Sequence, residues 1–165
     1  MRAPFRIFMI MVVALTTCQL AAFAQERQNF YQDPFLQVTH ALAACPTPEG
    51  PMMTAQEARA ESHWRVERGT SCYRSGRCRL PNSYLYDKEI MPRVQKFILQ
   101  DDQFQETSVW IKGQRRWVYL MGCVKTAEQA AAMEQKVRDI DDVEAVINQL
   151  QVGTPGHPPY PLAKP

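Results

Sequence analysis

The sequence predicts an α+β fold in which a three-stranded sheet carries two helices on one face and follows a helical, disulfide-linked extension. Two observations lead to this prediction. Between residues 87 and 152, periodic patterns follow one another in the order helix, strand, strand, helix, strand, an order that packs the helices against one face of a sheet. Before residue 87, one further helical pattern is followed closely by Cys72 and Cys78. The 165 residues, 45% of them hydrophobic, suffice for one domain and argue against a disordered chain.

The N-terminus has the features of a secretory signal peptide over residues 1–24. Two arginines precede an apolar run from Ile7 to Leu15, and Ala22 to Ala24 offers small residues for cleavage. The run is too short for a permanent transmembrane helix, and no second run follows it. We therefore expect an exported, periplasmic protein without a transmembrane segment. A lipoprotein anchored at Cys18 is the alternative, although the preceding threonine matches a lipobox poorly.

Export would place the remaining cysteines in an oxidising compartment. Four of them follow the signal peptide, namely Cys45, Cys72, Cys78 and Cys123, so two disulfides are expected. Three pairings are possible. The close spacing of Cys72 and Cys78 favours a short loop between them, which leaves Cys45 to join Cys123. The alternative is a metal site made from Cys72, Cys78 and His63, but the spacing differs from that of usual zinc sites.

Residues 25–53 have the mixed composition of an arm or linker, and residues 54–86 form a helical extension rich in Cys and Arg. Thr54 and Glu57 make a capping box, which predicts a helix over residues 55–68 with Gly69 as its stop. On this helix His63 and Glu67 share one face. Such a pair can hold a metal, but a charged surface helix is the favoured explanation.

The charge distribution contains one local excess. The chain has 19 basic and 17 acidic residues; two of the basic residues lie in the signal peptide, so the remainder balances, 17 against 17. This balance argues against nucleic acid as a partner. Between Arg59 and Tyr86, however, six arginines face only two glutamates. This patch, which includes Arg74, Arg77 and Arg79, is either a binding surface or a solvated helix face.

The region from residue 87 to 152 begins with a helix and a hairpin. Asp87 can cap a helix that runs to about Gln100 and whose buried face contains Ile90, Val94, Phe97 and Ile98. Residues 108–111 and 116–121 then form two strands joined by a tight turn at 112–115. This register places Val109 opposite Val118 and Trp110 opposite Trp117. The two tryptophans form either an exposed platform or a core that the N-terminal half covers.

The region ends with a helix and a strand. Thr126 and Gln129 make a second capping box, and the following helix carries an apolar stripe of Ala130, Met133, Val137 and Ile140. A final strand covers residues 143–152. The Pro-rich tail, residues 153–165, is expected to be disordered, with a polyproline ligand around Tyr160 as the alternative.

Residues 87–152 resemble the BON domain, a bacterial module named after osmotically inducible and nodulation proteins. The resemblance is carried by Val118, Leu120, Gly122 and Val124, by the helix after Thr126, and by the ending with Val143, Val146, Asn148, Leu150 and Val152. Gly122 matches the family glycine at the end of the second strand, where the backbone is expected close to the following helix. The chain departs from the pattern where Asp141–Asp142 replaces the usual Gly before the last strand, and its hairpin is longer.

The resemblance implies a non-catalytic protein that binds phospholipid or supports the cell envelope under stress. In a two-domain relative the first helix of one BON domain contacts lipid, which corresponds here to the helix around Met91, Lys96 and Leu99. The expected contact residues for an anionic phospholipid or an envelope protein are therefore Arg74, Arg77, Arg79, Met91, Lys96, Leu99, Trp110 and Trp117. No motif of a hydrolase, metalloprotease or phosphate loop occurs, so we expect no enzyme activity, metal or cofactor. A docking module in an envelope or secretion assembly is the alternative function.

Overall fold

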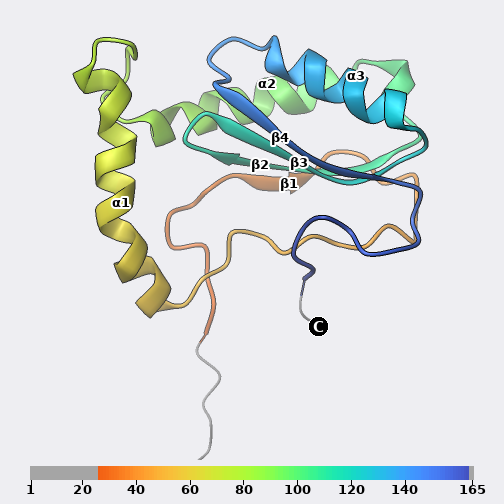
Figure 1. The fold of residues 1–165 in the computed structure, drawn as a ribbon, viewed down its shortest axis with the longest axis horizontal. Helices are drawn as coiled ribbons and strands as arrows, with labels where there is room; N and C mark the ends of the chain where they lie inside the picture. Colours follow the sequence, from red (N-terminus) through yellow and green to blue (C-terminus); the bar gives the residue numbers. More distant parts are fainter. Residues whose placement is uncertain (1–25, 164–165) are drawn as a thin grey trace, which may run out of the picture.

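The computed structural model describes residues 26–163, which form one mixed sheet with helices on one side (Figure 1). The predicted signal peptide and Cys18 lie outside these residues. The strands are β1 (Phe35–Gln37), β2 (Ser108–Gln114), β3 (Trp117–Val124) and β4 (Ala145–Val152), in the spatial order β1-β2-β3-β4. The helices are α1 (Ala55–Arg74), α2 (Asp87–Leu99) and α3 (Ala127–Arg138), with two 3-10 turns, η1 (Ser83–Tyr86) and η2 (Asp102–Phe104).

The sheet has four strands rather than the predicted three, because the arm contributes β1. β1 pairs antiparallel with β2, β2 antiparallel with β3, and β3 parallel with β4. The rest of the predicted element order is confirmed. The arm therefore belongs to the sheet and is not a linker beside it.

The hairpin between β2 and β3 turns later than predicted. Arg115 and Arg116, with φ of 59° and 67°, form the turn, so Trp110 lies opposite Met121 rather than Trp117, and Val109 lies opposite Gly122. Two consecutive left-handed residues match the twist of a two-residue hairpin turn. The shift is an even number of residues, so each side chain keeps its predicted face of the sheet.

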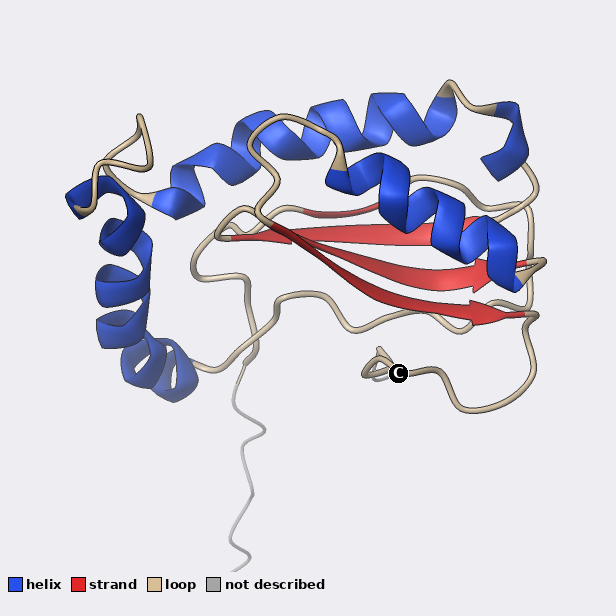
Figure 2. Cartoon of the chain, turned by 45° about the horizontal axis from the view of Figure 1, so that its top comes forward, coloured by secondary structure: helices blue, strands red, loops and turns tan. Residues whose placement is uncertain are grey.

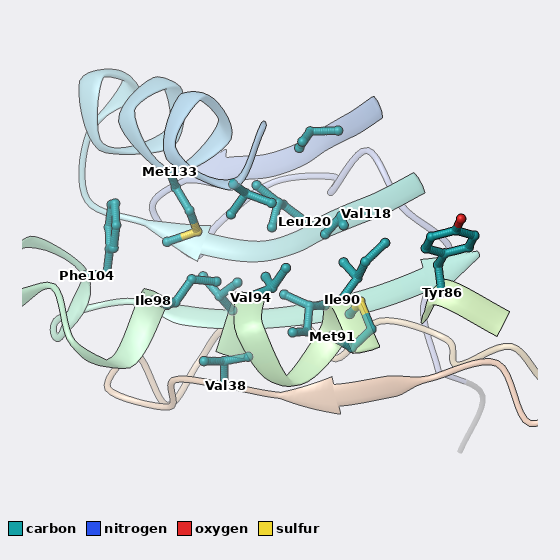
Figure 3. Packing of buried hydrophobic residues seen from close by; sticks show 14 of the residues in the cluster. Val38, Tyr86, Ile90, Met91, Val94, Ile98, Phe104, Val118, Leu120 and Met133 are labelled. Atoms are coloured by element: carbon teal, nitrogen blue, oxygen red, sulfur yellow. The ribbon is translucent and has the colours of Figure 1, made fainter. Parts of the chain in front are cut away.

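The core lies between the sheet and helices α2 and α3 (Figures 2 and 3). Val109, Ile111, Val118 and Leu120 point into it from the hairpin, and all four are fully buried. The predicted stripe of α3 is confirmed, with Met133 and Val137 buried and Ala130 and Ile140 packed at the margin.

Helix α2 faces the sheet slightly differently from the prediction. Ile90, Val94 and Ile98 are buried as expected, but Phe97 is 40% exposed and Met91 is only 2% exposed. Met91 packs on Gly113, where a Cβ atom would lie 2.7 Å from its sulfur. Because the arm widens the sheet at this edge, the helix flank that bears Met91 is covered.

The opposite face of the sheet is covered as well, so the tryptophans form no exposed platform. Trp110, Met121 and Cys123 pack there with Cys45 of the arm and Tyr160 of the tail. The Cys45–Cys123 disulfide joins the arm to β3. The tail is not disordered between 153 and 163: Tyr160 is buried, its hydroxyl donates to the Pro46 carbonyl at 2.9 Å, and Leu162 bridges to Pro48.

Helix α1 projects from one end of the sheet (Figure 1) and is longer than predicted. Its capping box of Thr54 and Glu57 is confirmed. Gly69 does not end the helix but lies within it, where its missing side chain makes room for Asn82; a Cβ atom would lie 2.5 Å from the amide oxygen. The helix continues to Arg74, and the Cys72–Cys78 disulfide closes the turn that follows.

Gly122 and Asp142, which lie at the two positions where the family pattern has glycine, both have a positive φ. Gly122 has a φ of 119°, and a Cβ atom there would lie 2.1 Å from the Ser108 carbonyl oxygen. The backbone next to Gly122 therefore belongs to β2. The resemblance had suggested the following helix instead. Asp142 has a φ of 71° at the place where the family has Gly, and the last strand begins at Ala145 rather than Val143.

Candidate functional site

The outer face of α2 combines exposed apolar and cationic side chains. Phe97 and Leu99 are 40% and 44% exposed, Lys96 is exposed beside them, and Lys88 is exposed more than two turns earlier in the helix. Within residues 26–163, neither lysine forms an ion pair with a carboxylate. Unpaired ammonium groups beside exposed apolar side chains suit an anionic, partly apolar surface.

Shallow cavities flank α2 on both sides. Toward α3, Phe97 contributes to a cavity of about 330 Å³ that it shares with Arg93, Lys136, Asp139, Ile140 and Asp141. Toward β1, a cavity of about 310 Å³ is lined by Pro34, Leu36, Lys88, Met91, Pro92 and Gln95. The second cavity is mainly apolar, with a lysine in its wall. Neither cavity brings together groups suited to acid-base or nucleophilic chemistry.

The two basic side chains that line the cavity between α2 and α3 are paired with carboxylates. Lys136 pairs with Asp101, and this hydrogen bond, together with that from Gln103, holds the pKa of Asp101 below its usual value. Arg93 pairs with Asp142 at 3.1 Å. Near this end of α2, these pairs leave Lys96 without a carboxylate partner among the described residues.

The tip of α1 carries a second group of cations. Arg74 and Arg77 are exposed on either side of Gly76, inside the loop that the Cys72–Cys78 disulfide closes. Arg79, just outside the loop, pairs instead with Glu89 and Asp142 across the molecule. Arg79 thus contributes mainly to holding the extension against α2, whereas the other two arginines face solvent.

A buried ion pair attaches α1 to the rest of the molecule. The Arg65 guanidinium donates two hydrogen bonds to Asp33, one of them at 2.9 Å, and lies between the rings of Tyr31 and Tyr84, 4.0 and 3.8 Å from their centroids. Arg65 also pairs with Glu61, one turn earlier in the helix, at 3.5 Å. Burial opposes the charged form of Arg65, yet the hydrogen bonds and charge of Asp33 raise its pKa overall. Arg65 therefore stays charged, and its hydrogen bonds to Asp33 fix the helix.

Asp87 has a different role from the predicted helix cap. Its side chain is 1% exposed and accepts hydrogen bonds from the backbone N–H groups of Arg115 and Arg116, each at 2.7 Å. Burial raises the pKa of Asp87 from 3.8 to about 6, although the two N–H groups act in the opposite direction. This carboxylate connects the start of α2 to the hairpin turn.

The structure separates the predicted contact residues into three groups. Arg74, Arg77, Lys96 and Leu99 are exposed and available. Arg79 is exposed but engaged in ion pairs. Met91 and Trp110 are buried, so neither side chain is presented to an external partner.

Trp117, the eighth predicted contact residue, belongs to none of these three groups. It is half-buried beneath the Arg115 guanidinium, 4.7 Å from its ring centroid. Phe97 and Lys88 are also exposed on α2, although neither was among the predicted contact residues.

The described residues hold no group of three or more His, Cys, Asp or Glu side chains placed to bind a metal ion. The alternative site on Cys72, Cys78 and His63 is ruled out in this oxidised state because the two cysteines are joined to each other. His63 and Glu67 form an ion pair at 3.2 Å on the surface of α1. Within residues 26–163, no helix has the length and apolar content needed to cross a bilayer.

Comparison with protein families identifies the region that contains α2, the hairpin, α3 and β4. The model of the BON domain matches residues 86–154. No curated protein and no solved structure is significantly similar to the chain. The BON domain is associated with membrane and phospholipid binding in envelope proteins, and its members are generally non-catalytic and typically periplasmic. Residues 86–154 of this chain belong to the BON domain family.

Proposed function

We propose that this chain is an exported, non-catalytic envelope protein that binds the surface of phospholipid membranes through the outer face of α2 and supports envelope integrity under stress. Its signal peptide would be residues 1–24, and residues 54–86 would extend the BON domain. The observation that carries the proposal is the exposed cluster of Lys96, Phe97 and Leu99 at the end of α2.

The chemistry of this cluster agrees with a membrane interface. The lysine has no carboxylate partner in the described part of the chain, and each basic residue near an anionic membrane contributes about 1 kcal/mol to binding. The exposed Phe97 and Leu99 can enter the boundary between head groups and acyl chains. The two disulfides agree with an oxidising compartment.

The proposal is tested by co-sedimentation of the protein, purified after export, with vesicles of phosphatidylglycerol or of phosphatidylcholine at low and high salt. We expect Lys96→Gln to weaken binding to anionic vesicles about fivefold, and Leu99→Ser to weaken binding about tenfold. The matched control is Leu162→Ser, because Leu162 is similarly exposed, at 47%, but lies in the tail on the other face of the sheet. Absence of binding to both kinds of vesicle would refute the proposal.

One observation favours the second function, docking in an envelope or secretion assembly. β4 is the edge of the sheet, and its eight residues contain no charge, proline or glycine. Edge strands usually carry such residues to prevent pairing with other chains, so this edge can accept an added strand. If the protein does not bind vesicles, Ile147→Lys should abolish the complex that the protein forms with a partner protein of the envelope. Because Ile147 lies outside the α2 surface, the same change should leave vesicle binding intact.

A further inference from the structure

The stretch after the middle of α1 is cationic without compensating acids. Residues 68–86 contain four arginines, Arg68, Arg74, Arg77 and Arg79, and no Asp or Glu. Arg68 stacks on Trp64, 5.2 Å from the ring centroid, and Arg79 is held by Glu89 and Asp142. Among the described residues, Arg74 and Arg77 have no carboxylate partner. The end of α1 therefore presents two unneutralised guanidinium groups.

These two arginines belong to a loop that a disulfide and hydrogen bonds close, and whose two cysteines are anchored in the core. The N–H groups of Arg77 and Cys78 both donate to the Cys72 carbonyl, at 2.9 and 3.2 Å, and the Ser75 hydroxyl donates to the same oxygen. The disulfide joins Cys72 to Cys78 across the loop. Arg77 Nε donates to the Ser75 hydroxyl at 3.1 Å, but neither guanidinium is paired with a carboxylate among the described residues, so the charge of both remains available to an external anion.

An amphipathic side chain lies next to the arginines. Tyr73, directly before Arg74, is 49% exposed. Tyrosine suits a half-wet boundary because its ring is apolar and its hydroxyl polar. A guanidinium beside such a ring matches the head groups of a bilayer, where anionic phosphates lie next to apolar chains. A freely soluble phosphate would offer no partner for the exposed ring of Tyr73.

The loop is placed so that it can act together with α2. In Figures 1 and 2 the turn after α1 lies on the same side of the sheet as α2 and α3, away from the tail. The buried pair of Arg65 with Asp33 and the ion pair of Arg79 with Glu89 fix α1 in this position. One flat surface can thus meet the loop and the outer face of α2 together.

We propose that the disulfide-closed loop at the end of α1, with Tyr73, Arg74 and Arg77, is a second membrane contact that selects anionic phospholipid head groups. The inference rests on the proposed function, because it assigns lipid selectivity to the extension and general membrane affinity to the BON domain. It also explains why the loop is closed: a fixed loop keeps both guanidinium groups directed at the same surface.

The test compares binding to vesicles of pure phosphatidylcholine with binding to vesicles containing phosphatidylglycerol, using the whole exported protein with its disulfides intact. Arg74→Gln/Arg77→Gln should weaken binding to the anionic vesicles about 30-fold, from about fivefold for each arginine, and should flatten the salt dependence. Binding to phosphatidylcholine should stay within twofold. The substituted side chains are exposed, so circular dichroism should show an unchanged fold.

The control is Arg59→Gln, because Arg59 is an exposed arginine near the other end of the same helix, about 22 Å from Arg74 at 1.5 Å per residue. It should change binding less than twofold, whereas Arg74→Gln alone should reduce it about fivefold. If the double variant binds anionic vesicles like the unaltered protein while Leu99→Ser is impaired, the inference fails and the proposed function stands, and an acidic protein surface becomes the partner to seek. If the unaltered protein binds no vesicles, both fail.

Discussion

The buried carboxylate of Asp87 should make the stability of the fold depend on pH in an unusual direction. Because burial raises the pKa of Asp87 from 3.8 to about 6, the folded state binds a proton over a pH range where the unfolded chain has released it. The contribution of Asp87 to stability is therefore complete below about pH 4 and is lost as pH rises through 6. The whole shift corresponds to about 3 kcal/mol at 1.36 kcal/mol for each pKa unit.

The perturbation that isolates this effect is Asp87→Asn, which retains the shape but does not titrate. We expect the free energy of unfolding of the unaltered protein, minus that of the variant, to fall by about 2.5 kcal/mol between pH 4 and pH 7.5. Urea unfolding at a series of pH values measures this difference, and the other titrating groups cancel in it. The carboxyl carbon of Asp87 should also titrate near pH 6 in the folded protein by NMR.

Two results would contradict this reasoning. A difference that does not vary with pH would mean that Asp87 keeps an ordinary pKa despite being buried. A difference that increases with pH would mean that the N–H groups of Arg115 and Arg116, which donate to the carboxylate, outweigh the cost of its burial. In that case the carboxylate would stabilise the hairpin turn most strongly at neutral pH.

Two further predictions concern the backbone and the disulfides. Gly122→Ala should destabilise the protein by about 3 kcal/mol or more, because the added Cβ would clash with a backbone carbonyl in a left-handed conformation. Gly76→Ala has open space around it and should destabilise the protein by only about 1 kcal/mol. Equal losses of stability for the two variants in thermal unfolding would refute this prediction. Replacing both cysteines of the long-range disulfide by serine should cost about 4.5 kcal/mol for a separation of 78 residues. The same change in the disulfide at the end of α1 should cost about 2 kcal/mol for a separation of 6 residues. If urea unfolding shows a larger loss of stability for this short loop than for the long one, loop length does not govern the cost of removing a disulfide.

The features that could be predicted from the sequence are those whose interactions lie within a few residues of one another. The capping box of Thr54 and Glu57 depends on bonds across three residues, and the stripe of α3 depends on helical spacing alone. The alternation of apolar residues in β2 and β3 likewise assigned each side chain to its correct face. Together with Gly122, these local signals were enough to indicate a BON domain.

The candidate site could be predicted in part for the same reason. Lys96 and Leu99 are exposed as expected, since they lie on the helix face away from the sheet. Met91 was misplaced because its burial depends on β1, which is contributed by residues more than fifty positions earlier. No periodicity within α2 reveals that the sheet has been widened beneath one of its flanks.

By itself, the sequence therefore determined the order of the elements from α1 to β4, the caps at Thr54 and Thr126, and the four cysteines that follow residue 24. Only the tertiary structure decided where the hairpin turns, because a carboxylate from Asp87 is the acceptor for the turn's N–H groups. It likewise decided that Arg65 pairs with Asp33, 32 residues away, and that the tail packs around Tyr160. Each of these contacts joins distant segments, and their energies depend on burial, which arises only when the whole chain has folded.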